Sequence, residues 1–158
     1  MLMQLATLDT GDLGHAAVLS SENELLDLVR SGLAPDAPAA VKDILGRDSA
    51  MDAVRKALNS LAALSEDERQ SLRQSGALVA LESAELLAPV PRPSLILSVG
   101  LNYHRHLAEM EGTPAPALPS AFMKTIASLN GAGKPIVIPP QCPDMIDYEA
   151  ELCFVFGR

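Results

Sequence analysis

Three prolines at alternate positions restrict the backbone between residues 88 and 93 more than any other feature of the sequence. Pro89, Pro91 and Pro93 fix their own φ angles, and each disfavours a helical conformation in the residue before it. The segment is therefore expected to be extended and stiff, and to separate two parts of the chain. We predict a small N-terminal domain over residues 1–87 and a second domain over residues 88–158.

The N-terminal part alternates apolar runs with turn-forming residues, which predicts two strands followed by helices. The strands are expected at residues 5–8 and 16–19. Two short helices are expected, one over residues 25–29 after a capping box at 21–24 and one over residues 38–45 before Gly46. A third is expected from Asp48, with an apolar stripe of Met51, Val54, Leu58 and Leu61. A fourth is expected from the capping pair Ser65 and Glu68 to Gly76. This part is expected to be a packing module, and His15 to be a polar residue without a partner.

The second part of the sequence, after residue 87, has a different pattern of apolar runs and loops. An apolar run over residues 94–99 predicts a buried strand that ends at Gly100. Residues 104–111 predict one or two helical turns, residues 113–119 a proline-rich loop, and residues 136–138 a further strand. The clearest pattern is the strict alternation of Tyr148–Phe156, which predicts a strand.

Charge and composition exclude several classes of protein. The 158 residues include 12 Lys and Arg against 20 Asp and Glu, a formal net charge of −8, which disfavours nucleic acid and anionic membranes as partners. No apolar run approaches the ~20 residues needed to span a bilayer, and the N-terminus lacks the basic start of a signal peptide. Two cysteines are too few for a disulfide framework, so a cytoplasmic protein is expected.

Glu149 and Glu151 fall on the same face of the last predicted strand, about 7 Å apart at two residues of ~3.3 Å rise. Two carboxylates at that spacing repel each other unless a positive charge lies between them. Their oxygens are the hard ligands that Mg²⁺, Mn²⁺ or Ca²⁺ prefer. The alternative is a solvated strand face that carries two unrelated glutamates.

His106 and Glu109 form a second candidate, three residues apart on one face of the predicted helix. A carboxylate beside an imidazole raises its basicity, which a base that activates water requires. An ordinary surface contact is the alternative.

Three other motifs do not meet their requirements. A phosphate loop around Gly131 and Gly133 would need glycine in place of Ser128 and Ser or Thr in place of Pro135. Cys142 and Cys153 lack the spacing of a zinc site, and no Gly-x-Ser-x-Gly motif supports a serine nucleophile.

Several co-linear motifs resemble the fumarylacetoacetate hydrolase family over roughly residues 87–158. They are Leu87–Pro93, Val99–His106, Phe122–Lys124, Ser128–Gly133, Pro135–Pro139 and Asp147–Leu152. Residues 1–29 are similar, more loosely, to the smaller N-terminal region of many members. The resemblance implies an α+β protein in which a small N-terminal α/β region precedes the start of a mixed β-roll, truncated here.

The resemblance also implies roles for five residues. The family's Glu-x-Glu pair, which binds a divalent cation together with a more distant aspartate, maps to Glu149 and Glu151. The cation is expected to be Mg²⁺ or Mn²⁺, with Ca²⁺ also open, and no other cofactor is implied. The motif Asn-Tyr-x-x-His places the catalytic histidine at His106 with Glu109 as its acidic partner, and Lys124 matches a lysine close to the substrate.

The implied reaction is hydrolysis of a C–C bond in a 2,4-dioxo acid such as an acylpyruvate, through a metal-bound enolate. Decarboxylation, isomerisation and hydration share that enolate, so a decarboxylase, isomerase or hydratase in aromatic-compound catabolism stays open. A small 2-oxo acid is the expected substrate, and the full-length form is expected to be a homodimer.

The sequence ends at Arg158, one predicted strand after the acidic pair, whereas the family continues for about as long again. We therefore expect a fragment or a truncated product that is inactive by itself, with the third metal ligand beyond Arg158. The alternative is a non-catalytic remnant that binds a full-length relative through its unpaired sheet edge.

Overall fold

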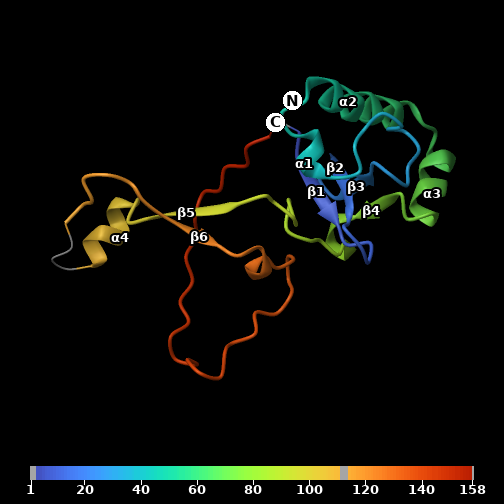
Figure 1. The fold of residues 1–158 in the computed structure, drawn as a ribbon. Helices are drawn as coiled ribbons and strands as arrows, with labels where there is room; N and C mark the ends of the chain where they lie inside the picture. The colour runs from blue at the N-terminus through green and yellow to red at the C-terminus, as the bar shows by residue number, and fades with distance from the viewer. Residues whose placement is uncertain (1–2, 111–113, 158) are drawn as a thin grey trace. The chain divides into compact units, whose positions relative to one another are not determined.

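The computed structural model describes residues 3–110 and 114–157, which divide into two compact units. The first unit comprises Met1–Pro91 and Asn130–Arg158, and the second comprises Arg92–Leu129. Each unit has its own antiparallel sheet, of four strands in the first and two in the second (Figure 1). Helices and strands together confirm the α+β class. The division at residue 87 stays a prediction.

The four strands of the first unit lie side by side in chain order. They are β1 (Leu5–Leu8), β2 (His15–Ser21), β3 (Glu24–Asp27) and β4 (Leu78–Ala80), and a 3₁₀ turn at Leu81–Ser83 follows β4. Short connections favour the antiparallel pairing of β1 with β2 and of β2 with β3, whereas residues 28–77 with three helices separate β3 from β4. The strands predicted at residues 5–8 and 16–19 are confirmed, and β2 extends beyond its predicted range on both sides.

The prediction of a helix over residues 25–29 is wrong, because residues 25–27 belong to strand β3. Leu25 and Leu26 are both buried, but they contribute to different apolar clusters on opposite faces of the sheet. A strand covered on both faces shows a continuous apolar run, which does not distinguish a strand from a helix by periodicity. The predicted capping box at residues 21–24 is instead the turn that joins β2 to β3.

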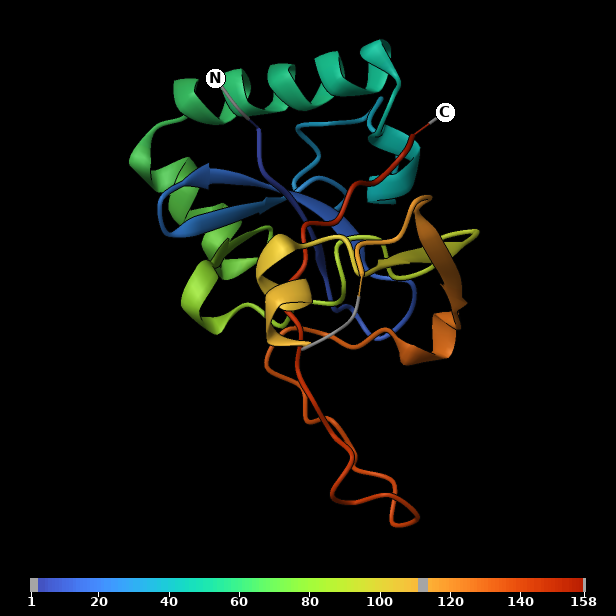
Figure 2. The same ribbon diagram turned by 90° about the vertical axis from the view of Figure 1, so that its left-hand side faces the viewer.

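Three helices follow, α1 (Val41–Ile44), α2 (Asp48–Ala63) and α3 (Glu66–Gln74). Ile44 of α1 and Val54 of α2 are fully buried in one apolar cluster with Val18 and Leu26 of the sheet. Figure 2 shows α2 lying across the sheet. The helix predicted from Asp48 is confirmed, whereas the one predicted over residues 38–45 is shorter and begins at Val41.

The predicted stripe of α2 is only partly right. Val54 and Leu61 are buried, while Met51 and Leu58 are partly buried at the edge of the cluster. Three alanines complete the buried face, namely Ala50, Ala53 and Ala57. Small side chains let the helix backbone approach the sheet closely, which a count of large apolar residues overlooks.

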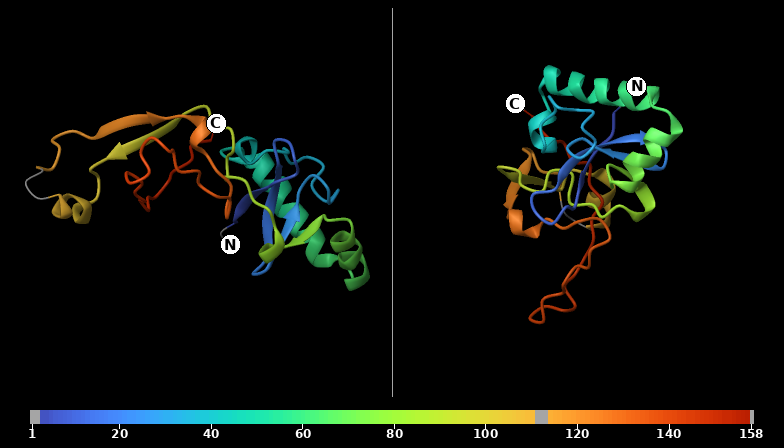
Figure 3. Two further views of the ribbon diagram at one scale, coloured as in Figure 1. Left: turned by 90° about the horizontal axis from the view of Figure 1, so that it is seen from below. Right: turned by 90° about the vertical axis from the view of Figure 1, so that its right-hand side faces the viewer.

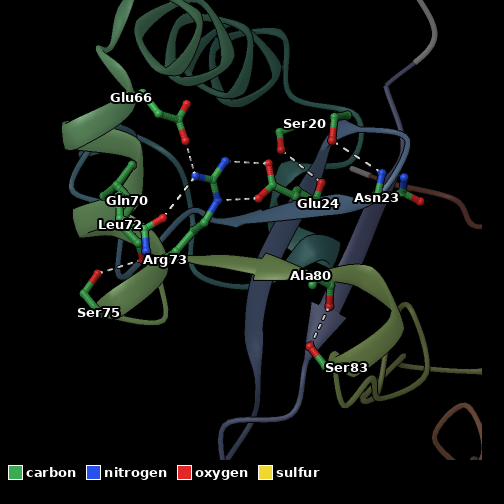
Figure 4. Close-up of polar contacts among 11 residues, drawn as sticks. Ser20, Asn23, Glu24, Glu66, Gln70, Leu72, Arg73, Ser75, Ala80 and Ser83 are labelled. Carbon is green, nitrogen blue, oxygen red and sulfur yellow. Dashed lines mark hydrogen bonds and ion pairs between the residues drawn. The ribbon is translucent and has the colours of Figure 1, made fainter.

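Helix α3 has the predicted capping box. The Ser65 backbone N–H donates to Glu68 Oε2 at 2.8 Å, and the Glu68 backbone N–H donates to Ser65 Oγ at 3.4 Å. Arg73 near the end of the helix pairs with Glu24 of β3 at 2.7 Å and with Glu66 at 2.6 Å (Figure 4). These contacts raise the pKa of Arg73, the hydrogen bond to Glu24 most strongly, and they fasten α3 to the sheet.

The expectation that His15 lacks a partner is wrong. Its Nδ1 lies 2.9 Å from Oδ2 of Asp27, which is fully buried. The other carboxylate oxygen of Asp27 accepts hydrogen bonds from the backbone N–H groups of Val29 and Arg30, at 2.8 and 2.9 Å. A buried carboxylate needs such partners, and Asp27 uses them to hold the chain as it leaves β3.

The second unit is a hairpin of β5 (Ile96–Gly100) and β6 (Ser120–Lys124), with α4 (His104–Glu109) between the strands and a 3₁₀ turn at Ile126–Ser128 after them. The strand ending at Gly100 and the short helix are confirmed. The helix ends at Glu109, and residue 111 of its predicted range lies outside the described part. The strand is not buried as predicted, because Leu97 is 57% exposed. The predicted loop over residues 113–119 is present from residue 114, and residue 113 lies outside the described part.

Two predicted strands are absent from the described structure. Residues 136–138 and Tyr148–Phe156 form no ladder with another segment, and Figure 3 shows this part of the chain as an irregular ribbon. A strand exists only when its backbone N–H and C=O groups find a neighbouring strand. The alternation is present in the sequence, but the pairing that would make it a strand is missing from the described residues.

Replacing Asp27 with alanine is expected to lower the free energy of unfolding by about 3 kcal/mol, since it leaves His15 and two backbone N–H groups without their acceptor. Urea denaturation measures the change. Asp52→Ala is the matched control, because the pair between Asp52 and Arg55 is exposed and should matter little. Equal losses in the two variants would contradict the role assigned to Asp27.

Acid is expected to loosen the start of α3. Hydrogen bonds from the side chain and backbone of Ser65 lower the pKa of Glu68 below its usual 4.5. A lowered pKa in the folded state stabilises the protein above pH 4.5, and this contribution is lost as the pH falls through the lowered value. NMR detection of the Ser65 amide against pH should show a midpoint below 4.5. A midpoint at or above 4.5 would contradict the capping box.

Candidate functional site

His106 and Glu109 lie on the same side of α4, as their spacing predicts. His106 Nδ1 is 3.9 Å from Glu109 Oε2, and both side chains are exposed. This is the separation of an ion pair rather than a hydrogen bond. Because the carboxylate faces Nδ1, the opposite nitrogen, Nε2, is the one suited to exchanging a proton with another molecule.

A sharp turn of the backbone sets the start of α4. Leu101, directly after β5, has a positive φ of 54°, a backbone conformation that residues other than glycine seldom adopt. The helix begins three residues later, and its first turn is closed by a hydrogen bond from the Leu107 N–H to the Tyr103 carbonyl at 3.1 Å. Nothing in the sequence around Leu101 predicts this conformation.

The structure does not bring Lys124 beside the pair on α4. Lys124 ends β6 and lies opposite Ile96, whereas α4 follows the other end of β5 at Gly100. Four residues of strand separate those two ends by about 13 Å. Within the hairpin, Lys124 Nζ lies 5.7 Å from the centre of the Phe122 ring.

Glu149 and Glu151 belong to the first unit and are both exposed. As a donor set they fit a hard divalent cation, because both offer carboxylate oxygens that water already reaches. Among the described residues, no group of three His, Cys, Asp or Glu side chains could complete such a site. Residues 3–110 and 114–157 thus supply two donors and no third.

The other face of the same stretch is apolar and uncovered. Tyr148 and Phe156 are each 93% exposed, and Leu152 and Phe154 are also exposed. Alternating residues of this kind are typical of a strand with one face in a core. The stretch therefore has the side chains of a core strand without the core.

Lys134 is a residue that sequence reasoning missed. It lies in the rejected phosphate-loop motif, and its Nζ pairs with Glu85 Oε2 at 2.9 Å and with Asp9 Oδ2 at 3.8 Å. The hydrogen bond to Glu85 raises the pKa of Lys134 above its usual value. Glu85 is 49 positions away, so no local pattern could have indicated the pair.

Residues 95–158 match the family model described as "Fumarylacetoacetate (FAA) hydrolase C-terminal". The matched segment contains all five residues assigned by resemblance. Over these residues the chain is similar to the fumarylacetoacetate hydrolase family. The predicted resemblance is confirmed over this segment, while the roles of the individual residues stay predictions.

Curated relatives carry more specific names. The chain is 28% identical over 158 residues to the mitochondrial oxaloacetate tautomerase fahd2 of Xenopus laevis, an alignment covering 99% of this chain and 44% of that protein. It is 40% identical over 72 residues to the mitochondrial oxaloacetate tautomerase FAHD2A of Homo sapiens, covering 46% and 22% respectively. Protein Rv2993c of Mycobacterium tuberculosis is 40% identical over 78 residues, covering 49% and 28%. The chain thus spans less than half the length of these relatives.

We predict that the backbone amides of Glu149, Glu151 and Val155 exchange with solvent at nearly the rate of an unstructured peptide in this chain, since their segment forms no ladder among the described residues. Hydrogen exchange measured by NMR tests this. The amides of Leu25 and Leu26 in β3 serve as the protected reference. Comparable protection in the two segments would contradict the unpaired state.

Proposed function

We propose that the protein is an enzyme that moves a proton on a small 2-oxo acid with the help of a divalent cation, and that oxaloacetate is its substrate. The observation that carries the proposal is the contact between His106 and Glu109 inside the segment that matches the family model. The names of the Xenopus and human relatives support the choice of oxaloacetate.

His106 acts as the acid and base in this proposal. Its Nε2 takes the proton from the carbon next to the carbonyl of oxaloacetate and returns a proton to the carbonyl oxygen. One C–H bond breaks and one O–H bond forms, so the keto form becomes the enol. Glu109, facing Nδ1, stabilises the imidazolium that exists between the two transfers.

Glu149 and Glu151 would hold the cation, with Mg²⁺ or Mn²⁺ preferred and Ca²⁺ also suited to their oxygens. When bound, the cation supplies a positive charge that polarises the carbonyl and makes the neighbouring C–H more acidic. Lys124 is exposed at the end of β6 and would contact a carboxylate of the substrate.

The second candidate is hydrolysis of a C–C bond in an acylpyruvate-like 2,4-dioxo acid, favoured by the description of the matched family model. In that reaction His106 takes a proton from water, and the water oxygen bonds to the distal carbonyl carbon. The C–C bond then breaks, and the carbon that leaves receives the proton. Decarboxylation and hydration would use the same histidine.

Three further expectations stay proposals. A homodimer is expected for the longer form of the protein, and a cytoplasmic location is consistent with the free cysteines Cys142 and Cys153. None of the helices in the described part of the chain is long and apolar enough to cross a membrane. A non-catalytic remnant that binds a full-length relative is the alternative to an enzyme.

Replacing His106 with alanine is expected to lower the rate of oxaloacetate tautomerisation by about 100-fold or more, the usual contribution of a positioned acid or base. The assay follows the ultraviolet absorbance of the enol with Mn²⁺ present, using the protein as its own cell produces it. His104→Ala is the matched control, because His104 lies on the same helix two positions away.

Full activity in His106→Ala would contradict the assigned role of this residue. Loss of acetylpyruvate absorbance with no effect on oxaloacetate would favour the hydrolase instead. No reaction with either substrate, in a protein that associates with a full-length relative, would favour the remnant.

A further inference from the structure

A strained residue lies just before the helix that carries His106. Leu101 has a φ of 54°, and within residues 3–110 and 114–157 it is the one residue other than glycine with a positive φ. The other positive values in this part of the chain all belong to glycines. A left-handed backbone brings a Cβ too close to the neighbouring peptide, so Leu101 carries strain that the chain avoids elsewhere by using glycine.

The residue before Leu101 shows where the left-handed conformation is required. Gly100 could adopt it without strain, yet Gly100 ends β5 without a positive φ. A Cβ at Gly100 would meet only an ordinary contact, 3.8 Å from an atom of the Phe122 ring. The turn therefore falls on position 101, where the chain has a leucine, and not on the glycine beside it.

The conformation of Leu101 changes the direction of the chain. The backbone bends at Leu101 directly after the extended strand β5. Tyr103 is extended again, with φ −115° and ψ 126°, and α4 begins at the next residue (Figure 1). The direction in which α4 leaves the hairpin is thus set at the bend.

The orientation of His106 follows from the direction of α4. The Leu107 N–H donates to the Tyr103 carbonyl at 3.1 Å, so the first turn of the helix is fixed to the residue that precedes it. The contact between His106 and Glu109 lies within the helix and moves with it. That contact orients the imidazole ring on α4, but the direction of Nε2 relative to the hairpin depends on the bend.

We propose that Leu101 is a positioning residue for His106, because its left-handed backbone directs α4, and with it Nε2 of His106, toward the substrate. This inference rests on the proposed function of His106 as acid and base. Strained backbone conformations persist where the surrounding structure enforces them, and they are concentrated at functional sites. Leu101 touches no reacting atom and acts only through the helix.

Two kinds of substitution at position 101 give opposite predictions. Leu101→Gly and Leu101→Asn remove the apolar side chain but adopt a left-handed backbone readily. Leu101→Val keeps an apolar side chain, but a β-branched residue resists a positive φ. A role in side-chain packing would make valine the mildest of the three changes, whereas a role of the backbone makes it the most harmful.

The assay measures oxaloacetate tautomerisation with Mn²⁺ present, in the protein as its own cell produces it. We expect kcat to fall about tenfold in Leu101→Val, with KM within about twofold of the parent value, because a displaced base slows the chemical step. Leu101→Gly and Leu101→Asn should keep kcat within about twofold. Leu97→Val is the matched control, because Leu97 lies on β5, is 57% exposed and has no positive φ.

NMR of the 158-residue chain gives a readout that does not depend on activity. The amide signals of His106 and Leu107 should shift in Leu101→Val and stay close to the parent positions in Leu101→Gly and Leu101→Asn. Unshifted signals in Leu101→Val would overturn the claim that position 101 directs α4.

The kinetic results can overturn the positioning role in two ways. If valine is the mildest of the three changes, or if all three leave kcat unchanged, the backbone of Leu101 does not position His106. If His106→Ala keeps the parent kcat, the proposed function fails and the positioning role fails with it. These failures are distinguishable, because the first leaves His106→Ala impaired and the second does not.

Discussion

Pairing of backbone N–H and C=O groups is the constraint on which the structure depends. The first unit meets it locally, because β1, β2 and β3 follow one another closely enough to pair as successive hairpins. Tyr148–Phe156 has the side-chain alternation of a strand but pairs with no other strand among the described residues. The same kind of pattern therefore gives a sheet in one half of the chain and an irregular segment in the other.

Sequence reasoning succeeded where the determining interactions are local. The capping box of Ser65 and Glu68 spans three residues, and the pairing of His106 with Glu109 follows from helical spacing. It failed where a distant partner decides the outcome. Glu24 pairs with Arg73 across 49 positions instead of capping a helix. Leu25 is in a strand because its backbone pairs with Leu19 of β2 and with the distant Val79 of β4.

The candidate site shows the same division between local and distant interactions. Spacing predicted which side chains of α4 face each other, while the separation of Lys124 from that helix depends on the register of the β5–β6 hairpin. The left-handed backbone of Leu101 has no signal in the sequence, because the glycine suited to that conformation stands one position earlier, at Gly100. Motif order predicted the family that residues 95–158 match, and long-range packing decided where the motif residues lie.

We propose that Glu149 and Glu151 hold a divalent cation for chemistry on a 2-oxo acid. The most direct test of this proposal is calorimetric titration of Mn²⁺ into the chain and into the double variant Glu149→Gln, Glu151→Gln. Glutamine keeps the size of each side chain but removes the charge that attracts the cation. We expect one bound Mn²⁺ per parent chain and none in the double variant. Equal binding by the two proteins would place the cation elsewhere and contradict the account.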